Sequence, residues 1–239
     1  MIEIACRDAK MMWESEDWLT NPIALLKWAN GLEKGPALLL IRHSQRLEPR
    51  EAEKILEEPL TSLGIQMAEE FGRRLDCDKV VSIWHSHHMG AQQTAEGIVR
   101  GLMEKGRLVH LRGPNRTLLG PGWDAPKYMT MLKEMGLVPF FDSWARDRIP
   151  IEIIEPIGDF TQKLVVRTIG RIMGAPEESL HIHITHDLVV MAARKVFLDI
   201  DTTDENRVSY LGGFGIARSN DLLVGFLDYN QKQTWIGPS

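Results

Sequence analysis

The chain has 239 residues, of which 44% are apolar and 26% charged, and its net charge is −5 at pH 7. This length is enough for one domain with its own core, and the absence of any basic run argues against nucleic acid as a partner. Two cysteines, Cys6 and Cys77, exclude a disulfide framework, and the short apolar runs exclude a membrane span or secretory signal, so we expect a cytoplasmic protein.

The spacing of apolar residues predicts the regular elements in chain order. The first 35 residues have helical spacing, broken at Asn21-Pro22, and form an N-terminal extension. Residues 37–41 are a continuous apolar run, which is typical of a strand buried on both faces. The next helix begins at Thr61 or Ser62, and its apolar positions recur at helical period. The remaining predictions are a strand over residues 80–84, a helix over 91–105, a strand over 107–111, a helix over 159–173, a strand over 180–185, a helix over 187–198, and a hairpin of residues 208–217 and 222–227.

Residues 113–156 are less regular and contain many glycines and prolines. A stretch of this length between regular elements is often a lid or a specificity region, and we interpret it in that way. Trp123 and Trp144 lie within it and are candidates for stacking on a substrate, although a tryptophan is by default a core or cap residue.

The alternation of strands and helices predicts a three-layer, doubly wound α/β fold with a mostly parallel sheet. We expect a single domain over residues 1–239, made of the extension and a core over residues 36–227. In such sheets the ligand crevice lies beyond the carboxyl ends of the strands, where Arg42-His43 and His186-Asp187 both fall. The fold class therefore predicts that these two groupings, although far apart in the sequence, meet at one crevice.

The first grouping is Arg42-His43-Ser44-Gln45-Arg46, in which two arginines flank a histidine. A phosphate dianion needs several fixed donors, and guanidinium groups supply them in pairs. A neutral imidazole beside a bound phosphate can attack phosphorus and form a phosphohistidine. The alternative is that Arg42 and Arg46 pair with Glu48 or Glu51 on the surface.

The second grouping is His186-Asp187, where a predicted strand ends and a helix begins. A helix N-terminus favours a bound anion, and His186 can donate a hydrogen bond to phosphate oxygens. Asp187 can protonate the leaving oxygen if its pKa is raised near the phosphate. The alternative is that Asp187 only caps the helix and that His186 is a satisfied core residue.

Together these groupings resemble the histidine phosphatase superfamily. The family pattern begins with Arg-His-Gly at the first strand end, and here it reads Arg42-His43-Ser44. The acid phosphatase branch extends the pattern to RHGxRxP; this chain reads RHSQRLEP, so Arg46 matches and Pro49 comes one residue late. A helix opening LTxxGxxQ follows in the family, and residues 60–64 match its first part with the glutamine one residue early. His186-Asp187 matches the final His-Asp pair.

The resemblance implies a phosphoglycerate mutase-like fold and a metal-independent phosphomonoester hydrolase that acts through a phosphohistidine on His43. Arg42, Arg46 and His186 would then bind the phosphate. In the acid phosphatase branch the aspartate that matches Asp187 is the proton donor, whereas the mutase-like branch usually takes its donor from a glutamate in the middle of the chain. The same residues would also serve a phosphomutase.

One position departs from the family, which carries a further phosphate-binding arginine in a stretch like SSPxxRxxQTA. Here the Gln-Thr-Ala matches, but the arginine position falls on Gly90. Loss of one charge-assisted donor costs about 1.5–3 kcal/mol. His87 or His88 can replace it, because both lie beside the gap, and we place them among the substrate-binding residues. Arginines of the irregular segment are further candidates, namely Arg116, Arg146 and Arg148. The alternative is a weak or inactive protein that binds a phosphorylated ligand.

The histidines also permit a metal-binding interpretation, because His85, His87 and His88 lie close in sequence and His181 and His183 share one face of a strand. No cysteine or carboxylate spacing completes a known site, so we predict neither a metal nor another cofactor. The expected partner is a phosphorylated small molecule. A homo-oligomer is possible through the tryptophans of the N-terminal extension.

Overall fold

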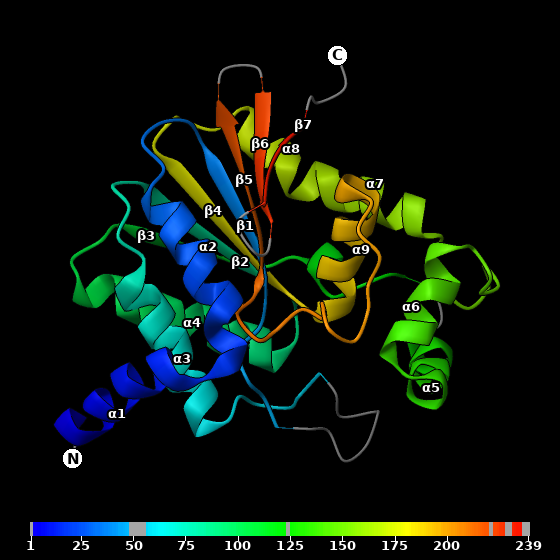
Figure 1. Ribbon diagram of the computed structural model, residues 1–239, viewed down its shortest axis with the longest axis horizontal. Helices are drawn as coiled ribbons and strands as arrows, with labels where there is room; N and C mark the ends of the chain where they lie inside the picture. Colours follow the sequence, from blue (N-terminus) through cyan, green and yellow to red (C-terminus); the bar gives the residue numbers. More distant parts are fainter. Residues whose placement is uncertain (1, 48–55, 123–124, 220–221, 228–230, 236–239) are drawn as a thin grey trace.

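The structure, a computed structural model, describes residues 2–47, 56–122, 125–219, 222–227 and 231–235. Within these residues one sheet of seven strands has the order β3-β2-β4-β1-β5-β6-β7 (Figure 1). The first four strands in this order are parallel, and the last three extend the sheet in antiparallel pairs. The strands are β1 (Ala37–Arg42), β2 (Val80–His85), β3 (Val109–Pro114), β4 (Ser179–Thr185), β5 (Gly213–Ser219), β6 (Leu222–Leu227) and β7 (Gln231–Trp235).

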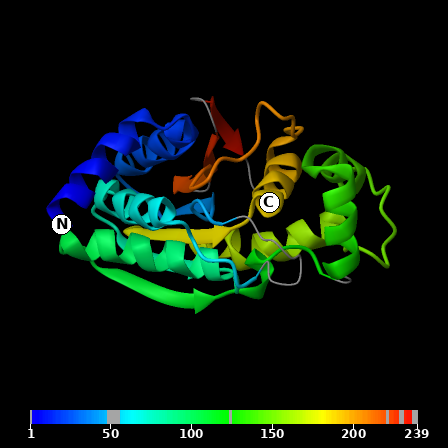
Figure 2. The same ribbon diagram turned by 90° about the horizontal axis from the view of Figure 1, so that it is seen from below.

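Helices cover both faces of the sheet, which confirms the three-layer α/β fold. Alternate residues of β1 point to opposite faces, so Leu39 and Ile41 join one core while Leu38 and Leu40 join the other. The N-terminal helices lie on one side of the sheet and α6, α7 and α9 on the other (Figures 1 and 2). The helices are α1 (Ile2–Ser15), α2 (Thr20–Asn30), α3 (Ser62–Arg74), α4 (Met89–Glu104), α5 (Ala125–Met135), α6 (Leu137–Ala145), α7 (Ile157–Arg167), α8 (Ile169–Met173) and α9 (Asp187–Leu198), with 3-10 turns η1 (Asp17–Leu19) and η3 (Arg116–Leu118).

Several predicted boundaries are wrong. The N-terminal extension breaks near Glu16, not at Asn21-Pro22, because Pro22 lies in the first turn of α2, where a missing N–H costs no hydrogen bond. The helix predicted over residues 159–173 is two helices separated at Thr168. The third strand begins two residues late, at Val109, and the final hairpin begins at Gly213.

The segment over residues 113–156 is more regular than expected, since it contains α5 and α6. Pro126 and Pro139 lie in the first turns of these two helices, so prolines that suggested irregular structure are compatible with helix. The N-terminal extension packs on the same chain. Trp13 is buried, and its ring lies 6.4 Å from that of Phe71 in α3. No described helix is both long and apolar enough to cross a membrane.

The register of the parallel strands aligns their carboxyl ends. Arg42 of β1 lies opposite Thr185 of β4, and His85 of β2 lies opposite Ile184. The residues that follow these three strands therefore emerge at one edge of the sheet, as the sequence predicted for two of them.

Candidate active site

Three histidines from three loops lie together at this edge. The ring of His43 stacks on that of His88, with centroids 5.5 Å apart and planes 6° apart. The ring of His186 lies 5.3 Å from His43 and 5.0 Å from His88. His43 and His88 are both 2% exposed. The structure thus brings together His43 and His186, as expected, and selects His88 as their neighbour.

The imidazole of His43 has a defined orientation. Its Nδ1 lies 2.7 Å from the carbonyl oxygen of Ser44, which can only accept, so Nδ1 carries the proton and donates. The lone pair is then on Nε2. Burial holds the pKa of His43 well below its usual value, and the neighbouring His186 and Arg42 lower it further. His43 is therefore a neutral imidazole with an unprotonated Nε2 at neutral pH, the form that a nucleophile needs.

The loop after β1 is held by the residues that resembled family motifs. Thr61 caps α3 by accepting a hydrogen bond from Gly64 N–H at 2.9 Å, and its own N–H donates to the Gln45 carbonyl at 3.1 Å. A Cβ on Gly64 would lie 1.9 Å from that carbonyl oxygen, so only glycine fits. Ser44 N–H donates to the Thr94 hydroxyl at 3.0 Å, and Ser44 Oγ–H donates to the Gly64 carbonyl at 2.7 Å. These hydrogen bonds join the three stretches that resemble family motifs, which lie around residues 42–46, 60–64 and 93–95.

Arg42 and Asp187 form an ion pair with 3.2 Å between Nη2 and Oδ2. Burial acts to raise the pKa of the Asp187 carboxyl, but Arg42 and the Leu188 N–H outweigh it, and the net shift is downward. The condition that the sequence analysis set for a proton donor, a pKa raised near the phosphate, is therefore not met by these neighbours alone, because the arginine expected to bind phosphate also holds this carboxylate.

The guanidinium of Arg42 has further neighbours. Its Nη1 donates to the Val208 carbonyl at 2.8 Å, and its Cζ lies 4.2 Å from the centroid of the Tyr210 ring. Its Nε is buried and makes no hydrogen bond to any residue that the structure describes. The surface pairing of Arg42 with Glu48 or Glu51 lies outside the described residues.

Burial and then His88 lower the pKa of His186 most. Arg46, another predicted phosphate ligand, lies near enough for its charge to lower it further. Pro49 of the same motif lies outside the described residues. His87 is exposed, whereas the adjacent His88 is buried at the centre of the group.

The space beside Gly90 is filled by His88. Gly90 N–H donates to Nδ1 of His88 at 3.0 Å, which caps α4 and leaves the ring proton on Nε2. A Cβ on Gly90 would lie 3.3 Å from the same ring and 3.4 Å from Leu60. The imidazole of His88 thus occupies the side of the site where the family pattern has an arginine.

The arginines of the segment over residues 113–156 have other environments. Arg146 pairs with Asp142 at 2.7 Å, Arg148 approaches the same carboxylate at 3.9 Å, and Arg116 is exposed in η3. Sequence reasoning missed two neighbours from the segment before β5: Tyr210, beside Arg42 and His43, and Arg207, whose charge lowers the pKa of Asp187. Tyr210 falls within the strand that the sequence predicted over residues 208–217, and Arg207 directly precedes that strand, so neither was identified as a site residue. In the structure both lie in the irregular segment before β5.

Sequence reasoning also missed Ser86, at the end of β2. Its Oγ lies 2.9 Å from Nε2 of His186, and the same oxygen accepts the His88 N–H at 3.3 Å. It directly follows β2, two residues beyond the predicted strand end at residue 84, and this nearness to a strand end was a signal that could have identified it. Ser86 therefore links the two histidines that flank His43.

The histidines considered as metal ligands are separated in space. His85 lies beside Ser86, whose carbonyl is 2.7 Å from its Nδ1, while His181 and His183 lie on the opposite sheet face against Trp84. Among the described residues no three histidines, cysteines or carboxylates have a geometry suited to a metal ion.

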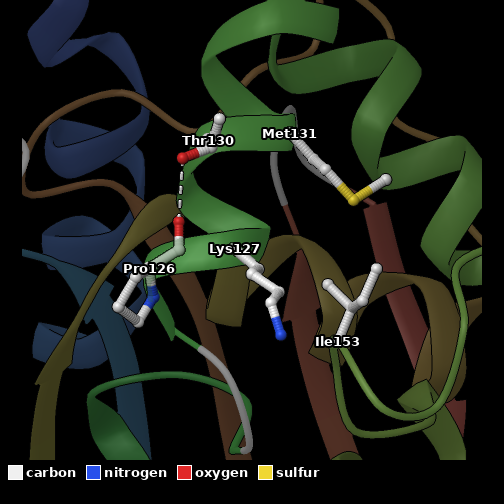
Figure 3. A pocket seen from close by; sticks show the side chains of 5 residues that line it. All are labelled: Pro126, Lys127, Thr130, Met131 and Ile153. Carbon is white, nitrogen blue, oxygen red and sulfur yellow. Dashed lines mark hydrogen bonds between the residues drawn. The ribbon is translucent and has the colours of Figure 1, made fainter.

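The predicted specificity segment also holds an open pocket of about 380 Å³ between the start of α5 and the loop before Glu155. Figure 3 shows its lining side chains, with the Thr130 hydroxyl donating to the Pro126 carbonyl at 3.0 Å. None of the histidines described above lines it. Trp123 lies outside the described residues.

Trp144, the other candidate for stacking on a substrate, is 1% exposed and packs on Phe141 and Phe160, and its Nε1 donates to the Glu155 carbonyl at 2.7 Å. We therefore expect Trp144→Ala to lower the free energy of unfolding by about 3–5 kcal/mol. Trp144→Phe, which loses mainly the hydrogen bond, should lose about 1 kcal/mol. Urea unfolding would measure both. An alanine variant of unchanged stability but raised KM would contradict a core role.

Comparisons with known proteins give one family and a set of similar folds. The family model described as histidine phosphatase superfamily (branch 1) matches residues 38–210. No curated protein matches the chain. The structure resembles Bacillus stearothermophilus YhfR, with 20% identity, a TM-score of 0.53, and coverage of 77% of this chain and 92% of that one. It also resembles a mutant phosphoserine phosphatase from Entamoeba histolytica in complex with phosphoserine, with 12% identity, a TM-score of 0.52, and coverage of 80% and 95%. At these identities the likeness concerns the fold.

Proposed function

The chain belongs to branch 1 of the histidine phosphatase superfamily, and from this we propose that it hydrolyses a small phosphomonoester through a phosphohistidine on His43. The observation that supports the proposal most is the hydrogen bond from His43 Nδ1–H to the Ser44 carbonyl, which directs a neutral Nε2 lone pair away from the loop. The closer likeness to the acid phosphatase branch, which rests on RHSQRLEP, stays a prediction.

In the proposed reaction Nε2 of His43 attacks phosphorus and the bond to the leaving oxygen breaks. Water, whose proton the Asp187 carboxylate accepts, then attacks phosphorus of the phosphohistidine and the P–N bond breaks. Phosphate is released, and the neutral imidazole and the protonated Asp187 are restored. The oxygens of the transferred phosphoryl group accept hydrogen bonds from the side chains around it, which are those of Arg42, Arg46, His88 and His186. The reaction as proposed uses only side chains of this chain and needs no metal.

Asp187 is proposed as the group that protonates the leaving oxygen. Its carboxylate is held by Arg42, but a phosphoryl dianion competes for the same guanidinium and adds negative charge nearby. Both effects raise the pKa of a carboxyl group. Substrate binding thus shifts Asp187 toward the protonated form that a general acid needs.

The proposal is tested by trapping the intermediate. Acid is avoided in the quench because a phosphoramidate bond is acid-labile, and mass spectrometry of the peptide containing residue 43 then measures phosphorylation during turnover. We expect phosphate on His43. Turnover with a phosphate-free His43 peptide would refute the phosphohistidine mechanism.

A second candidate function is binding of a phosphorylated ligand without turnover. Gly90 at the family arginine position and the Arg42–Asp187 ion pair favour it, since one guanidinium is missing and another is shared. Binding of substrate with no phosphate release by the wild-type protein would support this candidate. A phosphomutase would instead return the phosphoryl group to the substrate, which product analysis distinguishes.

His88 is proposed to donate from Nε2 in place of the missing arginine. We expect His88→Asn to lower kcat/KM by about a hundredfold, while an asparagine at this position still caps α4. His87→Asn is the matched control, because His87 is exposed, and its kinetics should equal those of the wild type. Equal loss in both variants, or none in His88→Asn, would show that His88 does not bind the phosphoryl group.

The role of Asp187 depends on the leaving group. Asp187→Asn should lower kcat by about a hundredfold on an alkyl phosphate, whose leaving oxygen must be protonated. The loss on p-nitrophenyl phosphate should be much smaller, because p-nitrophenolate leaves without a proton. Steady-state kinetics on both substrates measure the difference. If both rates fall equally, Asp187 acts only by orienting Arg42.

A further inference from the structure

A second group of polar and cationic side chains lies on one face of the sheet, away from the carboxyl ends of the strands. The register of β2 and β4 places Ser82 opposite His181 and Trp84 opposite His183, so these four side chains point to the same face. The ring of His183 stacks on Trp84, with centroids 4.8 Å apart and planes 11° apart. The ring of His181 lies 4.9 Å from Trp84.

Two arginines border this group, one from β3 and one from α8. Arg112 Nε–H donates to the Ser82 hydroxyl at 3.4 Å. Arg171 lies over Trp84, with Cζ 4.9 Å from the ring centroid, and its Nε–H donates to the Arg167 carbonyl at 2.8 Å. Each guanidinium is thus anchored through Nε, which leaves its terminal amino groups to donate elsewhere. In the part of the chain that the structure describes, neither arginine has a carboxylate within 4.0 Å.

Two buried polar groups lie between these arginines. The Ser82 side chain is 6% exposed and accepts from Arg112, so its own hydroxyl proton can be donated to another acceptor. Nδ1 of His181 is buried and makes no hydrogen bond to any described residue. Burial lowers the pKa of His181 to about 4, and the charges of Arg171 and Arg112 contribute. Buried polar atoms in native proteins nearly always have a partner. Because the nearby charges are both positive and neither arginine has a carboxylate partner among the described residues, the partner that this arrangement lacks is an anion.

We propose that Ser82, Arg112, Arg171 and His181 form a second site that binds the phosphoryl group of a small phosphorylated molecule. The four side chains come from four elements, β2, β3, α8 and β4. A phosphoryl group has three oxygens to accept from such donors, whereas a carboxylate has two. His181 precedes His186 by five positions along β4, which is roughly 16 Å at about 3.3 Å per residue. A ligand here therefore leaves the His43 site free, and the inference does not rest on the proposed function.

The test uses inorganic pyrophosphate and isothermal titration calorimetry on the full chain. Arg112→Gln and Arg171→Gln should each weaken one binding event about tenfold or more, while Arg42→Gln should retain that event. Arg100→Gln is the matched control, because it removes one exposed positive charge on α4 and should bind as the wild type does. Thermal melting checks that each variant is folded. Arg100, Arg112 and Arg171 are exposed, whereas Arg42 is half-buried and paired with Asp187.

The outcomes separate this site from the active site. A loss of binding that is confined to Arg112→Gln and Arg171→Gln supports the second site. If Arg42→Gln changes no binding event at all, that result counts only against the proposed function. Binding that is unchanged in Arg112→Gln and Arg171→Gln overturns the inference. Equal weakening in Arg100→Gln also overturns it, because the effect would then follow net charge. Tighter binding of succinate than of pyrophosphate overturns the phosphoryl assignment.

Discussion

His43→Ala should lower kcat for phosphate release by at least about a thousandfold, because the variant lacks the nucleophile and water must attack phosphorus directly. Neither of the two neighbouring histidines offers an equivalent nucleophilic nitrogen. Nε2 of His186 is hydrogen-bonded to Ser86 Oγ, and Nδ1 of His88 accepts a hydrogen bond from the Gly90 N–H. The measurement is phosphate release from p-nitrophenyl phosphate and from a panel of phosphorylated metabolites, with a chelator present.

The control for this experiment is His87→Ala, which removes an exposed imidazole next to the site and should leave kcat unchanged. Because His43 is buried, circular dichroism is used to check that His43→Ala is folded. Release by the wild type no faster than by His43→Ala would refute hydrolysis at this site. Loss of wild-type activity on adding chelator would instead refute the metal-independent mechanism.

The protein should lose stability steeply as the pH falls from about 7 to 5. Burial lowers the pKa values of His43, His183 and His186, so these residues stay neutral in the folded protein. In the unfolded chain each binds a proton near pH 6.5. The unfolded state therefore binds more protons, and the free energy of unfolding falls with pH by about 2 kcal/mol for each histidine that is still neutral at pH 5.

Urea unfolding at pH 7.5 and at pH 5 measures this loss. His183 is the best site for a matched variant, because its side chain is fully buried and lies outside the active site. His183→Leu should reduce the difference between the two pH values by about 2 kcal/mol, whereas His87→Asn should not change it. An unaltered pH dependence in His183→Leu would show that His183 does not stay neutral in the folded state. The aspartates and glutamates whose pKa values are lowered in the folded protein change the free energy of unfolding at lower pH, where their carboxylates become protonated.

The fold could be predicted largely from local patterns. Continuous apolar runs identify β1 and β4 because a strand buried on both faces must be apolar throughout. The predicted boundaries were wrong where proline begins a helix, as at Pro22, Pro126 and Pro139, since the same residue both breaks helices and starts them. The 42–46 and 186–187 groupings were identified because chemistry-bearing residues directly follow predicted strands.

The sequence by itself determined the α/β fold, the family and the meeting of His43 with His186, since these follow from residues at strand ends. Only the tertiary structure decided between His87 and His88, because adjacent residues at the start of a helix point in different directions. It also decided that Arg42 pairs with Asp187 and that Trp144 is buried. Arg42 and Asp187 come from distant parts of the chain, and the approach of such partners depends on packing that no local pattern records.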